Sequence, residues 1–199
     1  GWGFLREDEP YRDVLAKHCR GGIEFFGPRS TIGYEGSDEL GLEGSRLRWN
    51  RRTVTLPLIG KYNVLNALCA ISLAQKLGVP DDAIAQGLED VEPLFGRGQV
   101  FSGEVTVIQD CYNANTDSMI KAMEFVGSLP WTGRKILVLG SMKELGTDSD
   151  NEHRLVGDCA ADSDADAVFF YGEESAAAYN AARQKAKTGG NRFTWTDRK

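Results

Sequence analysis

The second half of this sequence alternates between short apolar runs and helical patterns, and this alternation constrains the fold more than any other feature. Residues 135–139, after the first, and 167–171 are all aliphatic or aromatic. Continuous apolar runs of this length are typical of parallel strands that are buried on both faces. Helical patterns at residues 117–129, 152–163 and 175–187 alternate with these runs. We therefore predict a doubly wound, Rossmann-like α/β domain.

The first half has a different pattern and ends in a linker. Hydrophobic residues recur at helical spacing over residues 64–77, and a second helix is predicted at 82–88. Before them, the β-like pattern and turn signals of residues 31–57 predict hairpins attached to an α/β sheet. A proline and a glycine interrupt regular structure within residues 91–96. We therefore place a domain boundary between residues 94 and 95.

Length and composition exclude several classes of protein. The chain has 199 residues, of which 41% are hydrophobic and 26% charged, as expected for one large or two small globular domains. The net charge of −6 gives no support for a nucleic-acid partner, and no apolar run approaches the ~18 residues of a membrane span. The four cysteines have no CxxC spacing, which favours reduced thiols and a cytoplasmic location over disulfides or a zinc site.

A polar decapeptide at residues 110–119 contains the densest group of candidate functional side chains. It follows a β-rich run, so we expect it at the end of a strand, where open α/β sheets bind ligands. Asp110 could accept hydrogen bonds from a ribose or orient a cation, and Asn113 and Asn115 each offer a donor and an acceptor. Ser118 lies at the start of the following helix, where free backbone N–H groups favour anions. The alternative is structural: an Asx-turn, with Ser118 or the residue before it capping the helix.

Two earlier segments carry candidate side chains that could bind a nucleotide. Asn63 and Asn66 open the helix predicted at residues 64–77 and could read the edge of a heterocyclic base, although Asn63 could instead be the N-cap. Arg97 is flanked by glycines at the predicted domain boundary. There it could reach a phosphate or be a solvated turn residue.

Lys143 and His153 belong to a second polar segment. Lys143 follows the apolar strand at residues 135–139, at the same edge of the sheet, and could contact a substrate or form a surface ion pair. His153, near the start of the next helix, is either catalytic or a polar structural residue. The sequence contains no phosphate-binding loop GxxxxGK[ST], no GxGxxG after a strand, no GxSxG, no HExxH and no cluster of metal ligands.

Four of these segments, in this order along the chain, resemble the Mur ligase family. Residues 58–67 are similar to the family's "GxHNxxNA" helix start, and residues 96–99 to its "GRxQ" junction. Residues 110–119 are similar to "DxYNANPxSM", which is particular to the branch that adds D-alanyl-D-alanine to UDP-N-acetylmuramoyl-tripeptide. Residues 139–146 are similar to "LGxMxELG", followed by the expected histidine. The resemblance covers residues 23–195, and the set of four in order is specific.

The sequence departs from the family pattern at two positions and in length. Tyr62 stands where the family usually has His, and Thr116 where it usually has Pro. The family has three domains, and its phosphate loop and magnesium-binding carboxylate lie upstream of these segments. The resemblance implies that residues 1–94 are the rear portion of the central ATPase domain, with β-hairpins. It implies that residues 95–199 are an incomplete Rossmann-like C-terminal ligase domain.

The resemblance implies an ATP-dependent amide-bond ligase of peptidoglycan precursor synthesis. A substrate carboxylate attacks the γ-phosphate of ATP to form an acyl phosphate, and the amine of D-alanyl-D-alanine then displaces phosphate. ATP and Mg²⁺ are the implied cofactors, with the metal ligands expected mainly outside this chain. UDP-N-acetylmuramoyl-tripeptide and D-alanyl-D-alanine are the implied partners, and a monomer is the default expectation.

The resemblance also implies roles for individual residues. Asn63 and Asn66 would contact the adenine side of ATP, whereas Arg97 and Asp110 would meet its phosphate or ribose across the domain junction. The residues implied to form the rim that faces the acyl phosphate and the dipeptide are Tyr112, Asn113, Asn115, Ser118 and Lys143. The implied catalytic residues are Asp110, Asn113 and His153.

Two other hypotheses remain open at this point. A sister ligase that extends folates with glutamate shares the ATPase core, but its signature does not replace Tyr-Asn-Ala-Asn here. A non-catalytic nucleotide-binding or interaction module is the second, because the chain has no phosphate loop. A phosphate loop encoded upstream would favour a ligase, and a gene that starts at residue 1 would favour the module.

Overall fold

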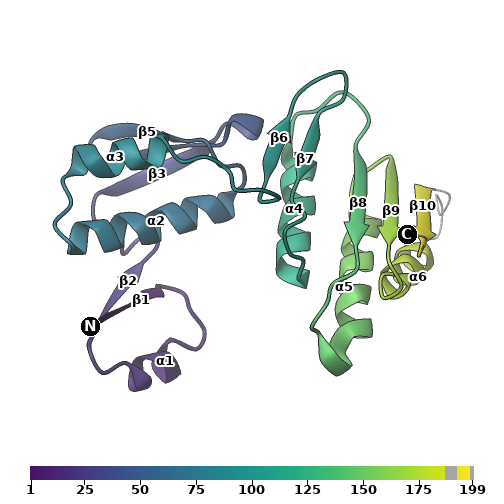
Figure 1. Cartoon of the computed structure of the whole chain (residues 1–199), viewed down its shortest axis with the longest axis horizontal. Helices are drawn as coiled ribbons and strands as arrows, with labels where there is room; N and C mark the ends of the chain where they lie inside the picture. The colour runs from purple at the N-terminus through teal and green to yellow at the C-terminus, as the bar shows by residue number, and fades with distance from the viewer. Residues whose placement is uncertain (187–191, 198–199) are drawn as a thin grey trace. The chain divides into compact units, whose positions relative to one another are not determined.

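The computed structural model describes residues 1–186 and 192–197. The chain divides into two compact units, Gly1–Leu94 and Phe95–Lys199 (Figure 1). Each unit has its own hydrophobic core. Both units combine helices with strands, and both parallel and antiparallel pairs occur. The predicted α/β class is confirmed.

The first unit begins with a small parallel pair of strands. Strand β1 (Trp2–Arg6) pairs with β2 (Gly22–Phe26), and helix α1 (Arg12–His18) connects them. A parallel pair needs such a crossover because the chain must return to the same end of the sheet. Helix α2 packs against both strands, so this pair joins the rest of the unit.

Next follows the antiparallel sheet β3 (Tyr34–Glu39), β4 (Ser45–Trp49) and β5 (Arg52–Leu56), which confirms the predicted hairpins. A short 3-10 turn, Gly41–Glu43, joins the first two strands. The β4–β5 turn consists of Asn50 and Arg51, with φ of 47° and 60°. Positive φ at both positions is the geometry of a type I′ hairpin, whose twist matches that of the flanking strands.

Helices α2 (Lys61–Lys76) and α3 (Asp81–Glu89) pack on this sheet. Val64, Leu68 and Ile71 of α2 are buried against sheet residues that include Leu47 and Trp49. Their helical spacing places them on one face of α2. The N-cap of α2 is Gly60, so the alternative of Asn63 as N-cap is wrong.

The second unit begins with an antiparallel ribbon of two short strands, β6 (Gln99–Phe101) and β7 (Val107–Gln109). In the register of this ribbon Gln99 lies opposite Gln109. The structure therefore corrects one expectation: β7, which leads into the polar decapeptide, belongs to this ribbon and pairs with none of the parallel strands in the described part of the chain. The ribbon instead brings the residues just before β6 next to those just after β7.

A three-stranded parallel sheet follows, in the order β8–β9–β10. Its strands alternate with helices, as predicted. The elements are α4 (Thr116–Ser128), β8 (Ile136–Gly140), the 3-10 turn Gly146–Asp148, α5 (Ser149–Asp162), β9 (Ala167–Tyr171), α6 (Ala176–Lys185) and β10 (Phe193–Thr196). The predicted end of the last helix at residue 187 lies outside the described residues.

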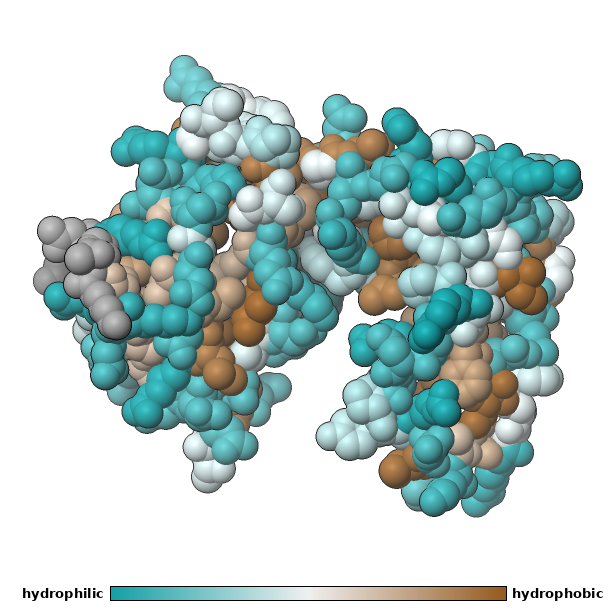
Figure 2. All heavy atoms as spheres, turned by 180° about the vertical axis from the view of Figure 1, so that it is seen from behind, coloured by the Kyte–Doolittle hydropathy of each residue, from teal (hydrophilic) through white to brown (hydrophobic). Residues whose placement is uncertain are grey.

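The two faces of this sheet differ. Leu137, Val168 and Phe170 point into a core that they share with α5 and α6. On the opposite face Val138 is 71% exposed and Ile136 is 53% exposed. The prediction that these strands are buried on both faces is therefore wrong for the described residues, because the helices described here cover one face only. Apolar residues also reach the surface in patches elsewhere (Figure 2).

None of the described helices is long and apolar enough to cross a lipid bilayer.

Candidate functional site

The β6–β7 ribbon joins two of the motif segments through glycine backbone. The Tyr112 N–H donates to the Gly96 carbonyl over 3.0 Å, and the Gly96 N–H donates to Oε1 of Gln99 over 3.0 Å. Gly96 has φ of +66°, and a Cβ atom there would lie 2.8 Å from the Tyr112 nitrogen. Both facts require glycine at this position. Gly96 and Tyr112, which flank the ribbon on its two sides, are therefore held in contact.

Arg97, Asp110 and Tyr112 come together at this point. The Arg97 guanidinium carbon lies 4.2 Å from the centroid of the Tyr112 ring. The Asp110 carboxylate accepts a hydrogen bond from the Gly98 backbone, on the other side of Arg97. Burial raises the pKa of Asp110 above its usual value, and the Gly98 hydrogen bond and the Arg97 charge oppose that rise. The structure therefore assembles a cation, a carboxylate and an aromatic ring from two segments that sequence reasoning singled out.

The start of α4 is held by a capping box. The Asn115 side chain accepts the Ser118 N–H over 2.8 Å, and Ser118 Oγ accepts the Asn115 N–H over 3.1 Å. The N-cap is thus Asn115, whereas the structural alternative named Ser118 or Asp117; the latter pairs with Lys121 one turn later. Asn113 is exposed, and its Oδ1 accepts the Ala114 N–H. These contacts stabilise the helix start, and substrate binding by Asn113, Asn115 and Ser118 stays a prediction.

Thr116 stands where the family usually has proline, and its hydroxyl forms contacts that proline could not form. Its Oγ1 donates to the Glu152 carboxylate on α5 and lies 3.6 Å from the Met142 sulfur. The departure from the family pattern therefore supplies a side-chain link between the start of α4, the segment after β8, and α5. Proline at this position could not form that link.

The segment after β8 meets the segment after β9. Lys143 forms an ion pair with Glu174, and Ser141 Oγ accepts the Ser175 N–H over 3.1 Å. The Lys143 ammonium, helped by hydrogen bonds from the Glu174 backbone and Ser141, lowers the pKa of Glu174 to about 2. Sequence reasoning missed Glu174, although it follows β9 as Lys143 follows β8, and these strands are neighbours.

The Lys143–Glu174 pair predicts a specific pH dependence of stability. Because the pKa of Glu174 falls from 4.5 to about 2 on folding, its stabilising contribution is complete above pH 4.5 and disappears as the pH falls to 2. We expect Glu174→Gln to lower the free energy of unfolding at pH 7 by less than about 1 kcal/mol, since the pair is solvent-exposed. The loss should vanish near pH 2 in denaturant titrations. Glu173→Gln, at the adjacent exposed position, is the control, and an equal loss at both pH values would contradict the prediction.

His153 is buried and both of its ring nitrogens are engaged. Its Nε2 accepts the Met142 N–H over 3.0 Å, and its Nδ1 donates to the Ser149 carbonyl over 2.7 Å. The side chain is 1% exposed. This geometry favours the structural alternative for His153, because neither nitrogen is left to take a proton from a substrate. The imidazole instead holds the segment after β8 against α5.

The two carboxamides of α2 form a pair in the first unit. Asn63 Nδ2 donates to the Ile59 carbonyl over 2.9 Å, and Asn66 Nδ2 donates to Asn63 Oδ1 over 3.1 Å. Asn63 is half-buried and Asn66 is exposed. The inner carboxamide therefore orients the outer, exposed one. Tyr62 packs beside Gly60, where a Cβ atom would lie 2.5 Å from a ring carbon.

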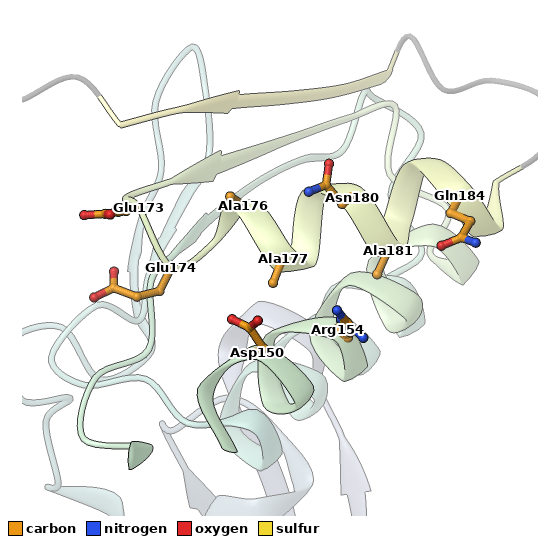
Figure 3. A pocket seen from close by; sticks show the side chains of 9 residues that line it. All are labelled: Asp150, Arg154, Glu173, Glu174, Ala176, Ala177, Asn180, Ala181 and Gln184. Carbon is orange, nitrogen blue, oxygen red and sulfur yellow. The ribbon is translucent and has the colours of Figure 1, made fainter. Parts of the chain in front are cut away.

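Two negative findings apply to the residues that the structure describes. Over residues 1–186 and 192–197, no three His, Cys, Asp or Glu side chains are grouped to hold a metal ion. A polar pocket lies between α5 and α6, where Asp150 and Arg154 face Ala177 and Ala181 (Figure 3). Of the residues discussed above, Glu173 and Glu174 line it. The predicted site residues therefore lie outside this pocket.

Fold and site together define a Rossmann-like α/β domain preceded by a ribbon that carries a clustered Arg, Asp and Tyr. The profile of the family described as "Mur ligase, glutamate ligase domain" matches residues 96–199. The match covers more than half of the chain, and the chain belongs to the Mur ligase family.

Relatives with known names agree with this assignment. The chain is 40% identical over 174 residues to the UDP-N-acetylmuramoyl-tripeptide--D-alanyl-D-alanine ligase of Treponema pallidum, covering 86% of this chain and 37% of that protein. It is 37% identical over 125 residues to the Escherichia coli ligase of the same name, covering 61% of this chain and 27% of that protein. The crystal structure of MurF from Acinetobacter baumannii has a TM-score of 0.81 and 26% identity, covering 98% of this chain and 42% of that chain. This chain thus spans about two fifths or less of these relatives.

Proposed function

We propose that this chain is part of an ATP-dependent ligase that adds D-alanyl-D-alanine to UDP-N-acetylmuramoyl-tripeptide. The reaction first forms an acyl phosphate from the substrate carboxylate and ATP, and the dipeptide amine then displaces phosphate. The observation that carries the proposal is the cluster of Arg97, Asp110 and Tyr112, which brings together the family's GRxQ junction and the segment particular to the D-alanyl-D-alanine branch. The names of the relatives in Treponema pallidum and Escherichia coli support the same branch.

We propose that two groups of residues bind ATP. Arg97 is exposed and can offer its planar set of N–H donors to a phosphate oxygen, and Asp110 beside it can accept from a ribose hydroxyl. Asn66, held by Asn63, has a carbonyl oxygen suited to the amino group of adenine. Mg²⁺ would neutralise phosphate charge during transfer, and we propose that its ligands lie mainly outside the described residues.

We propose that the start of α4 and the segment after β8 form the part of the site that binds the dipeptide. Asn113 is exposed and directly follows Tyr112 of the Arg97 cluster in the sequence. Lys143 is also exposed, although it is paired with Glu174. An ammonium that is already paired can still contact a carboxylate of the substrate through its remaining N–H donors. Because ATP is a co-substrate, the proposed compartment is the cytoplasm.

A folate-extending ligase is the second candidate. A folylpolyglutamate synthase from Mycobacterium tuberculosis has a TM-score of 0.68 at 18% identity, a likeness that concerns the fold alone. The Tyr-Asn-Ala-Asn segment at residues 112–115 favours the D-alanyl-D-alanine ligase.

The decisive experiment is a ligase assay on the complete gene product. It would contain ATP, Mg²⁺, UDP-N-acetylmuramoyl-tripeptide and D-alanyl-D-alanine, with ADP release and the pentapeptide product both measured. Parallel reactions would omit the dipeptide, or supply glutamate with a folate in its place. Product that depends on D-alanyl-D-alanine supports the proposal. ADP release that depends on folate and glutamate would establish the second candidate, and no turnover with either would favour a non-catalytic module.

A further inference from the structure

We infer that Tyr112 is a positioning residue, which acts by stacking its ring on the Arg97 guanidinium and does not itself contact the substrate. This inference rests on the proposed function, since it specifies how that site prepares its arginine for ATP. The sequence motif gives the tyrosine no separate role from the asparagines that follow it. The structure separates them, because Tyr112 faces back toward Arg97 whereas Asn115 caps α4.

The backbone fixes where the ring and the guanidinium meet. The hydrogen bond from the Tyr112 N–H to Gly96 anchors the tyrosine to the residue immediately before Arg97. On the other side of Arg97, the Gly98 backbone donates to the Asp110 carboxylate. Arg97 thus lies between two attachments to the segment that carries Tyr112. The distance of 4.2 Å between the Arg97 guanidinium carbon and the ring centroid lies well within the range of a cation–π interaction.

Stacking is well suited to hold an arginine that must remain able to bind phosphate. A guanidinium stacks through its flat face, and its five N–H donors project from the edge of the same plane. A direct ion pair with a carboxylate would occupy two of those donors. Among the described residues, the Arg97 guanidinium contacts the Tyr112 ring, and its charge also acts on the nearby Asp110 carboxylate. The ring therefore restricts the side chain and leaves its donors available.

The exposure of Tyr112 also supports its role as a positioning residue for Arg97. Tyr112 is 64% exposed, so removing its ring takes little from the core of the unit. The Arg97 guanidinium lies over the ring. The face of the ring is therefore the feature that matters, and phenylalanine should replace tyrosine in this role.

The first experiment measures the contact itself. The nuclear magnetic resonance signals of the Arg97 side chain would be recorded in this chain with Tyr112, with Tyr112→Phe and with Tyr112→Leu. A stacked ring moves these proton signals upfield, so we expect the shift with Tyr and Phe and its loss with Leu. Arg97 signals that do not change in Tyr112→Leu would overturn the inference. This result does not depend on whether the protein is a ligase.

The second experiment is a double-mutant cycle on the Michaelis constant for ATP in the complete gene product. We expect Tyr112→Leu to raise the KM for ATP about two- to five-fold, the range of an exposed cation–π contact, with a smaller change in kcat. Tyr112→Phe should restore the wild-type KM. In an Arg97→Ala background, Tyr112→Leu should have no further effect, because its partner is gone. Additive effects would mean that Tyr112 contacts the substrate directly and would overturn the inference, whereas an inactive wild-type protein would refute the proposed function alone.

Discussion

Gly157→Ala is expected to lower the free energy of unfolding of the second unit by about 1–3 kcal/mol, the usual cost of overpacking a core. Gly157 is buried in α5 at its contact with α6. A Cβ atom there would lie 2.1 Å from the Ala178 carbonyl oxygen and 2.8 Å from the Ala178 Cα. Both atoms belong to helix backbone, so no side-chain rotation can relieve the clash. The two helices would have to move apart, which would loosen the packing of their core residues Val156 and Ala182.

A change from glycine to alanine at position 127 should instead raise the free energy of unfolding. Gly127 lies in α4, and the nearest atom to a Cβ there is a side-chain oxygen of Asp164 at 3.9 Å. Alanine is the better helix former by up to about 1 kcal/mol, so Gly127→Ala should stabilise slightly. Urea or guanidinium titrations of the two variants and the wild type would give the comparison. Equal effects at both positions would show that α5 and α6 are not packed as closely as the structure indicates.

The elements that local patterns determine were predictable from the sequence. Helix α2 was evident because Val64, Leu68 and Ile71 repeat at the spacing that buries one helix face. Strands β8 and β9 were evident because their residues are apolar throughout. Their exposed face was not evident, because an apolar pattern cannot show how many helices cover a sheet. The sequence pattern at Ile136 and Val138 is the same whether helices cover one face of the sheet or both.

The candidate site shows the same limit at the level of single side chains. Arg97 and Asp110 could be named in advance because each lies beside a motif glycine or a strand end. Their proximity depends on the antiparallel register of β6 and β7, which places Gln99 opposite Gln109. The role of His153 also depends on a distant partner, the Met142 N–H, which no local rule identifies. Glu174 was missed because its partner Lys143 lies in the segment after the neighbouring strand β8 of the parallel sheet.

Arg97→Ala should have the largest effect on catalysis of any single change in the described site. Removing a charged hydrogen-bond donor from a phosphate contact costs about 1.5–3 kcal/mol, which corresponds to a rise of roughly 10- to 150-fold in the KM for ATP. Arg97 is exposed, so the substitution should leave the free energy of unfolding nearly unchanged. Steady-state kinetics of the complete gene product, with ATP varied at saturating tripeptide and dipeptide, would measure the effect.

Two variants make this prediction specific to the guanidinium. Arg97→Lys keeps the charge but loses the planar donors and the stack on Tyr112, so its KM for ATP should fall between wild type and Arg97→Ala. Arg134→Ala removes an exposed arginine that precedes β8, at the end of the strand opposite the Lys143 segment, and should leave the KM unchanged. If Arg97→Ala behaved like Arg134→Ala, Arg97 would be a solvated turn residue. In that case the ribbon that assembles it with Asp110 would serve only the fold.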